Sequence, residues 1–388
     1  MDLALLRQDF PALDQYVWFQ NGGVSITPKP VAAEHGRLMQ ELLDRGPMHI
    51  VYPDEEYPRR QRSIQRLADF LDVGPEELAL MRGVSEAFQT VLRGITWCEG
   101  DRIVITEDEE ASVLLPVLHL RDRHGVEVVK LPFIADVAGQ IEALDAAVSD
   151  RTRLIAVSHV STDIGHRLPI REICARARHL GVPTFVDMAH SAGLYQISVH
   201  ELGCDFAGIL SYKWMYAPYA SGLLYVRSDQ VQKLALSYAG GRSEAWLDFE
   251  RDDYGLRDTA ERFQYGPWSW PLIHAWAFGA GYLEEIGLGA IWDRTNLLAT
   301  RFKEGLKSVP GSILFTPDAP EFSAALVAFG IGGMDGESMC RSLRTRWNII
   351  TKPLPHTREG LRISMAFFTM ESEVDYLLEK LRLLASER

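Results

Sequence analysis

A carboxylate and a lysine each follow a short apolar run in the stretch 182–227. The run 184–186 leads to Asp187, and a second run leads to Ser211-Tyr212-Lys213. An enzyme that uses pyridoxal phosphate (PLP) needs such a pair. Its lysine binds the cofactor aldehyde as a Schiff base, and its carboxylate keeps the pyridine nitrogen protonated, so that the ring draws electrons from the substrate carbon. The alternative is a structural ion pair, but function is the commoner reason to bury two groups that are so costly to desolvate.

The residues that flank this pair match the pattern of a known family. They are Ala189, His190, Ser191 and Gly193 after the carboxylate, Ser211, Tyr212 and Trp214 around the lysine, and Pro218, Gly222, Leu224, Tyr225 and Val226 beyond it. The chain resembles the class V aminotransferase group of fold-type-I PLP enzymes, which includes cysteine desulfurases, isopenicillin N epimerase-like proteins, kynureninases and C–S lyases. The resemblance implies an α/β fold like that of aspartate aminotransferase, with a large PLP-binding domain and a smaller C-terminal α+β domain.

The hydrophobic pattern along the chain agrees with this fold class. Helices are predicted over 59–72, 85–97, 112–124, 140–148 and 169–180, alternating with strands over 78–81, 102–106, 126–131, 154–158 and 184–187. Such alternation implies a mostly parallel sheet between helices. After residue 270 the pattern changes to helices over 271–286, 291–308 and 372–384 and strands over 324–329, 348–351 and 361–364. We expect a large domain over 30–270 and a small domain from 1–29 together with 271–388.

The resemblance assigns further residues to the cofactor. Val84, Ser85 and Glu86 open a helix after a strand, with Ser85 expected as the N-cap, and N–H groups at a helix start bind phosphate. A serine there is usually only a cap, and the lysine is what favours the phosphate role. Ser211 corresponds to a second phosphate contact, and His190 to a residue near the phenolic oxygen of the cofactor.

Two cofactor positions depart from the family pattern. Thr162 stands where the family has an asparagine that bonds to the phenolic oxygen. In the segment 262–271 a family threonine is replaced by Pro267, which leaves Ser269 as the hydroxyl that reaches a dimer partner's phosphate. Trp268 and Trp270 beside it favour burial at an interface. The resemblance therefore implies a homodimer with active sites near the interface.

Three residues are implied to contact the substrate. Arg362, in Gly-Leu-Arg-Ile-Ser, corresponds to the arginine that holds the substrate α-carboxylate as a bidentate pair. Asn21 and Gly22 belong to a loop that lies over the active site. The stretch 351–358 holds no cysteine where cysteine desulfurases carry their nucleophile, so persulfide chemistry of that type is not expected.

Glu110 stands where the family places an aromatic ring over the cofactor. Carboxylates do not stack on rings, so we hypothesise that Glu110 is an acid/base group on the face opposite Lys213. Burial and the cofactor phosphate would then raise its pKa and suit it to proton donation near neutral pH. The alternative is a solvated acidic loop, since 107–110 is a run of four acidic residues.

Composition narrows the classes of partner. The net charge of −13 argues against nucleic acid or an anionic membrane. The four cysteines are far apart without a C-x-x-C pair, so neither a zinc ribbon nor a disulfide framework is expected, and no metal site is predicted. The sequence begins without a signal-like segment, and no apolar run approaches the roughly 18 residues of a membrane helix. We expect a cytoplasmic protein.

The sequence thus predicts a PLP enzyme that acts on the α-amino group of an amino acid, with Lys213, Asp187, His190 and Glu110 as catalytic residues. The favoured reaction is C–S bond cleavage by β-elimination without a catalytic cysteine. Epimerisation, transamination, and decarboxylating or oxidatively deaminating reactions share every residue named. A scaffold without cofactor is a further alternative. A nicotinamide enzyme lacks support, because no G-x-G-x-x-G follows an early strand.

Overall fold

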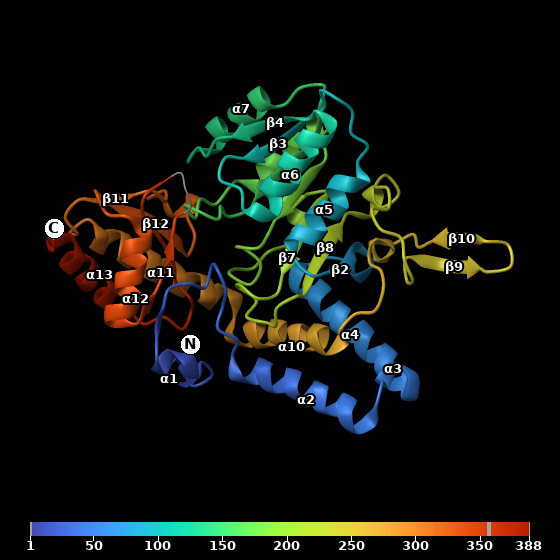
Figure 1. The fold of residues 1–388 in the computed structure, drawn as a ribbon, viewed down its shortest axis with the longest axis horizontal. Coiled ribbons are helices and arrows are strands. Elements are labelled where there is room, and N and C mark those ends of the chain that lie inside the picture. The colour runs from blue at the N-terminus through green and yellow to red at the C-terminus, as the bar shows by residue number, and fades with distance from the viewer. Residues whose placement is uncertain (1, 355–357, 388) are drawn as a thin grey trace.

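The computed structural model describes residues 2–354 and 358–387 and is built around a seven-stranded sheet (Figure 1). The strand order is β2-β8-β7-β6-β5-β3-β4, and β3 to β7 are parallel while β8 is antiparallel to both of its neighbours. The strands are β2 (Leu78–Met81), β3 (Arg102–Thr106), β4 (Glu127–Leu131), β5 (Thr152–Ser158), β6 (Thr184–Asp187), β7 (Phe206–Leu210) and β8 (Gly222–Val226). This mostly parallel arrangement confirms the predicted fold class.

Alternate residues of the central strands enter two separate hydrophobic clusters. In β5, Ile155 and Val157 belong to one cluster, and Leu154 and Ala156 belong to the other. Helices supply the opposite walls of both clusters, as expected for parallel strands buried on both faces. The first cluster is closed by α4 (Pro53–Leu71), α8 (Ile170–His179), α9 (Val199–Leu202) and α10 (Trp270–Ile286), the second by α5 (Val84–Gly94) and α6 (Ala111–His124).

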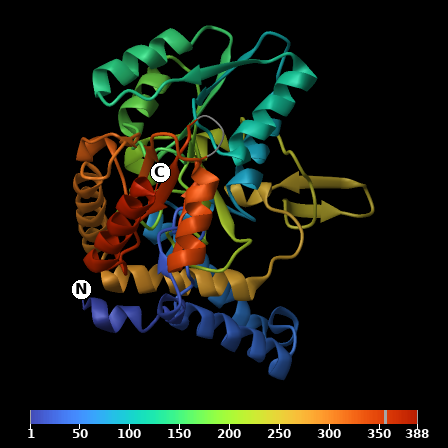
Figure 2. The ribbon, with the colours of Figure 1, turned by 60° about the vertical axis from the view of Figure 1, so that its left-hand side comes forward.

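Three long helices pack together under the sheet in the view of Figure 1. Helix α10 packs against both α4 and α2 (Lys29–Arg45), and both ribbon views show α10 and α2 side by side (Figures 1 and 2). The short α3 (Met48–Val51) connects α2 to α4, while α7 (Val137–Ala147) packs against β4. Helix α2 was not predicted from the sequence, and α4 begins at Pro53, six residues before the predicted start.

The small domain is built on a four-stranded antiparallel sheet of order β11-β12-β15-β14. Its strands are β11 (Ser312–Leu314), β12 (Leu326–Ile331), β14 (Lys352–Pro353) and β15 (Leu361–Ser364), and its helices are α11 (Leu288–Leu306), α12 (Gly336–Trp347) and α13 (Glu371–Ser386). The N-terminal segment joins this domain, because β1 (Val17–Trp18) pairs with β13 (Ile349–Ile350). Helix α1 (Leu3–Arg7) is tied to α13 by an ion pair of 2.9 Å between Arg7 and Glu373.

A two-stranded hairpin projects from the large domain on the right of Figure 1. It consists of β9 (Glu244–Asp248) and β10 (Asp253–Leu256), and it leaves Trp246, Phe249 and Tyr254 exposed. The sequence did not predict this hairpin. Within the described ranges, no helix is both long and apolar enough to cross a membrane.

Candidate active site

The carboxyl ends of β5, β6 and β7 open into a cavity of about 520 Å³. Ser158 ends β5, Asp187 ends β6 and Lys213 follows β7, and all three line this cavity. Parallel strands end at the same edge of a sheet, so two runs that are distant in sequence deliver their charged residues to one place. The structure therefore brings Asp187 and Lys213 together as the sequence predicted.

Lys213 is almost fully buried, and its Nζ lies 3.1 Å from Nε2 of His190. Burial lowers the pKa of Lys213 to about 8. The charge of Asp187 opposes this shift, while the charges of Arg362 and Lys352 add to it. The neutral amine, which is the nucleophilic form, is therefore accessible near neutral pH.

His190 is held in a polar network beside the lysine. The hydroxyl of Thr162 lies 3.3 Å from Nε2 of His190, and the indole N–H of Trp214 donates to Nδ1 at 3.5 Å. Burial lowers the pKa of His190 well below its usual value, and the charge of Lys213 acts in the same direction. The ring is therefore neutral, and its Nε2 can donate a hydrogen bond to the lysine nitrogen or accept one from it, depending on the tautomer.

Asp187 is buried, and its Oδ1 accepts a hydrogen bond of 2.8 Å from the N–H of Ala189. Burial raises the pKa of Asp187 to about 6, although this hydrogen bond and the charge of Lys213 oppose the shift. A buried carboxylate in this state is stabilised when a cationic N–H group approaches it. The protonated pyridine nitrogen of PLP is such a group.

Glu109 is a second buried carboxylate at this edge, and the sequence analysis missed it. It accepts hydrogen bonds from the N–H of Ser158 at 3.1 Å and its hydroxyl at 2.9 Å, and a further one from the hydroxyl of Thr106. Burial raises the pKa of Glu109 to about 7, and the charge of Asp187 acts in the same direction. Glu109 thus fixes the end of β5 beside Asp187. Its local signal is its place three residues after the apolar strand β3 ends.

The beginning of α5 forms a site for an anion. Val84, Ser85 and Glu86 line the cavity, and the first N–H groups of a helix lack acceptors within the helix. The expectation that Ser85 is the N-cap is wrong, because Gly83 holds that position with a φ of 156° that favours glycine. A Cβ on Gly222 would lie 2.6 Å from the Cα of Gly83, so β8 can pass this close to the turn only as glycine.

Arg362 on β15 reaches from the small domain to the same edge. Its Nη1 donates to the carbonyl oxygen of Thr162 at 2.5 Å and to the Thr162 hydroxyl at 3.2 Å. Arg362 is 1% exposed, and within residues 2–354 and 358–387 its Nε and Nη2 have no hydrogen-bond partner. Burial lowers the pKa of Arg362 to about 10. Buried donors without acceptors are costly, so this geometry suits a carboxylate ligand.

The N-terminal loop with Asn21 and Gly22 lies against these residues. The N–H of Gly22 donates to the hydroxyl of Ser364 at 2.7 Å, two positions after Arg362. A Cβ on Gly22 would lie 3.4 Å from Cε1 of His190. Asn21 is fully buried beside it. The loop therefore lies where the sequence analysis expected a substrate contact.

Glu110 lines the cavity, but its pKa is shifted in the direction opposite to the one expected. It is the N-cap of α6, and its Oε2 accepts from the N–H of Ala111 at 2.8 Å. Burial acts to raise the pKa of Glu110, but the charges of Lys213, Lys352 and Arg362 and the Ala111 hydrogen bond outweigh it, so the pKa is lowered. The predicted proton donor with a raised pKa is therefore wrong, because cations from distant parts of the chain hold Glu110 ionised.

Two predicted phosphate contacts are not among the residues that line this cavity. The hydroxyl of Ser211 donates to the carbonyl oxygen of Pro218. Ser269 is exposed before the first turn of α10 and lines a second cavity of about 420 Å³ together with Trp268 and Trp270. Among the described residues, Ser269 thus lines the second cavity and not the one that holds Lys213.

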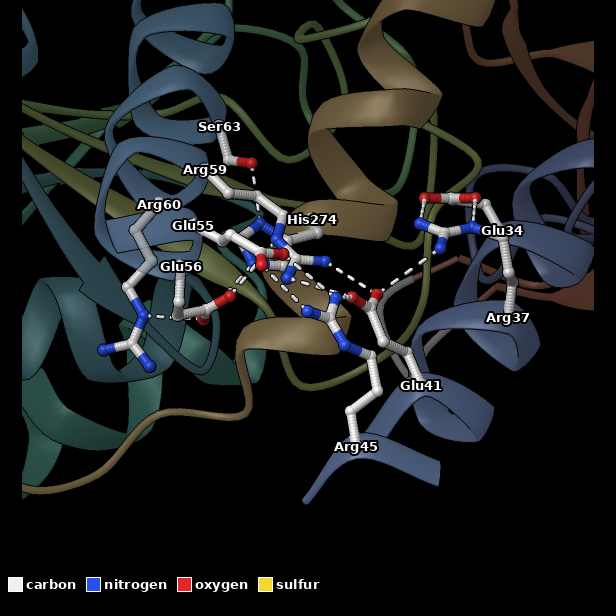
Figure 3. Close-up of polar contacts among 10 residues, drawn as sticks. All are labelled: Glu34, Arg37, Glu41, Arg45, Glu55, Glu56, Arg59, Arg60, Ser63 and His274. Carbon is white, nitrogen blue, oxygen red and sulfur yellow. Dashed lines mark hydrogen bonds and ion pairs between the residues drawn. The ribbon is translucent and has the colours of Figure 1, made fainter. Parts of the chain in front are cut away.

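A polar cluster beside the second cavity joins α2, α4 and α10 (Figure 3). Glu56 on α4 accepts a hydrogen bond of 2.8 Å from Nε of Arg60. His274 on α10 lies 2.8 Å from the hydroxyl of Ser63 and 3.6 Å from Glu56. These contacts fix the beginning of α10, and with it the segment that carries Ser269, against α4.

The residues that line the first cavity and were not predicted as site residues include one arginine and three tyrosines: Arg82, Tyr212, Tyr238 and Tyr265. Arg82 donates to the Tyr265 hydroxyl at 2.9 Å and forms an ion pair of 2.7 Å with Glu86. The ring of Tyr212 stacks on that of Tyr219, with centroids 5.1 Å apart. Only Tyr212 carried a sequence signal, since it lies in the lysine motif.

The residues of this cavity fit PLP. A buried amine with a lowered pKa, a buried carboxylate and a helix start that presents N–H groups stand in one cavity. They match the aldehyde, the pyridine nitrogen and the phosphate of the cofactor. Lys213, Asp187 and the turn 83–86 are therefore the groups able to hold it.

Comparisons with known proteins agree on one family. A family model described as aminotransferase class V matches residues 59–377. The chain is 26% identical to a probable cysteine desulfurase from Methanothermobacter thermautotrophicus, over 98% of this chain and 97% of that protein. It is 30% identical to isopenicillin N epimerase from Streptomyces clavuligerus, over 83% of this chain and 84% of that protein. The apo structure of a cysteine desulfurase from Thermococcus onnurineus NA1 matches with a TM-score of 0.88 and 25% identity, covering 99% of this chain and 98% of that one.

Proposed function

The chain belongs to the class V aminotransferase family, and we propose that within this family it cleaves a carbon–sulfur bond of an amino acid by β-elimination. It is a PLP-dependent enzyme with an amino-acid substrate. Bound PLP supplies an aldehyde for the substrate amine and a ring that takes up the electron pair left at Cα. The observation that carries the proposal is the buried Lys213 amine, 3.1 Å from a neutral imidazole, in a cavity whose Glu110 is held ionised.

Lys213 is the base in this reaction. Its lowered pKa makes a neutral amine available, and Nζ takes the proton from Cα of the substrate. The Cβ–S bond then breaks, and the sulfur leaves with the bonding electron pair. His190 holds Nζ in place through its 3.1 Å contact.

The other residues bind and orient. Asp187 keeps the pyridine nitrogen protonated, and the first N–H groups of α5, with Ser85, receive the phosphate. The Nε and Nη2 of Arg362, which have no hydrogen-bond partner among the described residues, receive the substrate α-carboxylate. The loop with Gly22 is fixed near this arginine, because the N–H of Gly22 donates to the hydroxyl of Ser364 on the same strand.

Epimerisation is the second candidate, because one relative is an isopenicillin N epimerase. It requires a proton to leave one face of Cα and another to arrive on the opposite face. Glu110 has a lowered pKa, so it is a poor proton donor near neutral pH. This favours elimination, which needs one base.

A cysteine nucleophile finds no support among the residues that line the cavity. Cys174 and Cys204 are buried, and burial raises the pKa of Cys174 to about 12 and that of Cys204 well above its usual value. Relatives that act as cysteine desulfurases support chemistry at a C–S bond. Release of the sulfur directly as a thiol accounts for both observations.

The test is product analysis with the PLP-loaded enzyme and S-substituted L-cysteines. Elimination releases pyruvate, ammonia and the free thiol in equal amounts. Lys213→Ala should abolish release, while Lys233→Ala, at an exposed lysine, should leave it unchanged. Substrate recovered from D₂O with deuterium at Cα, inverted configuration and no pyruvate would instead establish epimerisation.

The enzyme is further proposed to act as a homodimer in which Ser269 serves the partner's phosphate. Its position in the second cavity, away from its own Lys213, supports this arrangement. Mixing Lys213→Ala with Ser269→Asp subunits, each inactive alone, should restore activity, because one site of the mixed dimer then has both residues. Statistical exchange should restore about a quarter of the sites. Ser386→Asp, on the exposed end of α13, should retain activity alone, and failure of the mixture to regain any would exclude the shared site.

A further inference from the structure

We propose that the substrate carries a second, positively charged group beyond its sulfur, and that Glu110 recognises this group with support from Asp163. The inference rests on the proposed C–S lyase function and names its class of substrate. That class is S-linked amino acids whose side chain ends in an ammonium group.

Glu110 presents a carboxylate to the cavity. It lines the cavity with Lys213, and one of its oxygens accepts the N–H of Ala111 at 2.8 Å. Within the described part of the chain, no ion pair within 4 Å involves this carboxylate; the cations act on it from farther away. Space for a further donor therefore remains at Glu110.

Two of the three cations near Glu110 have other partners during the reaction. Lys213 attaches the cofactor and then takes the substrate proton, and Arg362 binds the α-carboxylate through Nε and Nη2, which have no partner in the described part of the chain. Lys352, opposite Arg362 in the sheet register, is the third cation and does not line the cavity. Among the described residues, none of the three cations forms an ion pair with Glu110, so its carboxylate is ionised and still open to a cation on the ligand.

Asp163 adds a second negative group on the side of Arg362. It is 7% exposed and does not itself line the cavity, but it follows Thr162, which lines the cavity and accepts from Arg362. Burial raises the pKa of Asp163 to about 6, so it is still mostly ionised at neutral pH; Arg362, Lys352 and Arg358 oppose the shift, while Glu110 adds to it. Glu110 and Asp163 repel each other across this region, and a cation on the ligand relieves the repulsion.

The position of Glu110 also bears on selectivity. A carboxylate attracts a ligand ammonium and repels a ligand carboxylate, so one residue both favours one substrate class and rejects another. Hydrogen bonds between charged groups in buried sites change affinity by about tenfold or more. We therefore expect discrimination of that size between side chains of equal shape.

The experiment compares three L-cysteine derivatives: S-(2-aminoethyl)-, S-propyl- and S-carboxymethyl-L-cysteine. The first two have the same number of heavy atoms and differ in charge. The wild-type enzyme should show a kcat/KM ratio of aminoethyl to propyl of about ten or more, and Glu110→Gln should lower this ratio about tenfold. Asp163→Asn should lower it by a smaller factor. Glu107→Gln, at an exposed carboxylate of the same loop, is the control and should leave the ratio unchanged.

Binding to the Lys213→Ala protein, measured by calorimetry, gives a readout without turnover. The dissociation constants should show the same preference for the aminoethyl compound, and Glu110→Lys in this background should shift the preference to the carboxymethyl compound. If no derivative is eliminated but the binding preference holds, the lyase function is wrong and the recognition is right. A ratio near one in the wild type, or a ratio that Glu110→Gln leaves unchanged, overturns the inference.

Discussion

Arg362 of the small domain donates to both the carbonyl oxygen and the hydroxyl of Thr162 in the large domain, at 2.5 and 3.2 Å. The Thr162 hydroxyl also lies 3.3 Å from Nε2 of His190, and that nitrogen lies 3.1 Å from Nζ of Lys213. A continuous chain of contacts thus connects the arginine to the lysine. The distance between the group that binds a carboxylate and the group that takes a proton is fixed before a substrate arrives.

Arg362→Lys should lower kcat/KM about 10- to 100-fold, because a lysine keeps the charge but loses the planar fork and the contacts to Thr162. The visible absorbance of the bound cofactor should stay, since Asp187, Lys213 and α5 are unchanged. Steady-state kinetics with an S-substituted cysteine and an absorbance spectrum check both points. An unchanged kcat/KM would place the carboxylate site elsewhere.

Lys213 of the cofactor-free protein should titrate near pH 8, below the value of 10.5 for a free lysine. Trace acetylation across pH, read out by mass spectrometry, should give that midpoint, with a lysine-containing peptide as the reference. Asp187 acts to raise the pKa of Lys213, so Asp187→Asn should move the midpoint lower still. A midpoint that rises in this variant would contradict the assigned electrostatics.

Glu109 should make the cofactor-free protein less stable as the pH rises. Burial raises its pKa from 4.5 to about 7, so the folded state binds the proton more tightly than the unfolded state. This stabilisation is fully present below pH 4.5 and is lost as the pH rises to 7, with a size on the order of 3 kcal/mol. The free energies of unfolding of the wild type and of Glu109→Gln, measured in urea, should therefore approach or cross each other between pH 4.5 and 7. Parallel pH curves for the two proteins would refute the shift.

Glu56→Ala should destabilise the large domain by about 3–5 kcal/mol, because it leaves the guanidinium of Arg60 without its buried acceptor and removes one of the two carboxylates that pair with Arg59 (Figure 3). The control is Glu55→Ala, which removes the adjacent carboxylate and its exposed ion pair with Arg45, and it should have a much smaller effect. Thermal or urea unfolding measures both. Equal losses of stability in Glu56→Ala and Glu55→Ala would show that the buried cluster contributes no more stability than the exposed ion pair.

The sequence was sufficient for the elements of the central sheet and for the cofactor. Strands β2 and β3 lie where predicted, because short apolar runs between turn signals are typical of strands buried on both faces. Lys213 and Asp187 were found because they end or follow such runs in a recognisable motif. The family, the fold class and PLP as cofactor are confirmed.

Charge states and turns were harder to predict, because they depend on residues that are distant in sequence. The acidic run 107–110 reads as one solvated loop, yet Glu109 is fixed by Ser158, and Glu110 is held ionised by Lys213, Lys352 and Arg362. Ser85 looked like a cap, but Gly83, with a φ of 156°, is the N-cap, and β8 passes so close to this turn that position 222 must be glycine. None of these contacts produces a local or periodic pattern in the sequence from which it could be predicted.

The contact between the N-terminal loop and β15 has a consequence for how the protein is made. The N–H of Gly22 and the hydroxyl of Ser364 that accepts from it are separated by 342 positions. A nascent chain must therefore hold its first segment without its partner until the last strands have left the ribosome, long after the Lys213 edge has been synthesised. Because of this order of synthesis, the part of the active site that contains Arg362 is completed last. A truncated or stalled chain therefore has Lys213 but lacks the arginine proposed to bind the substrate carboxylate.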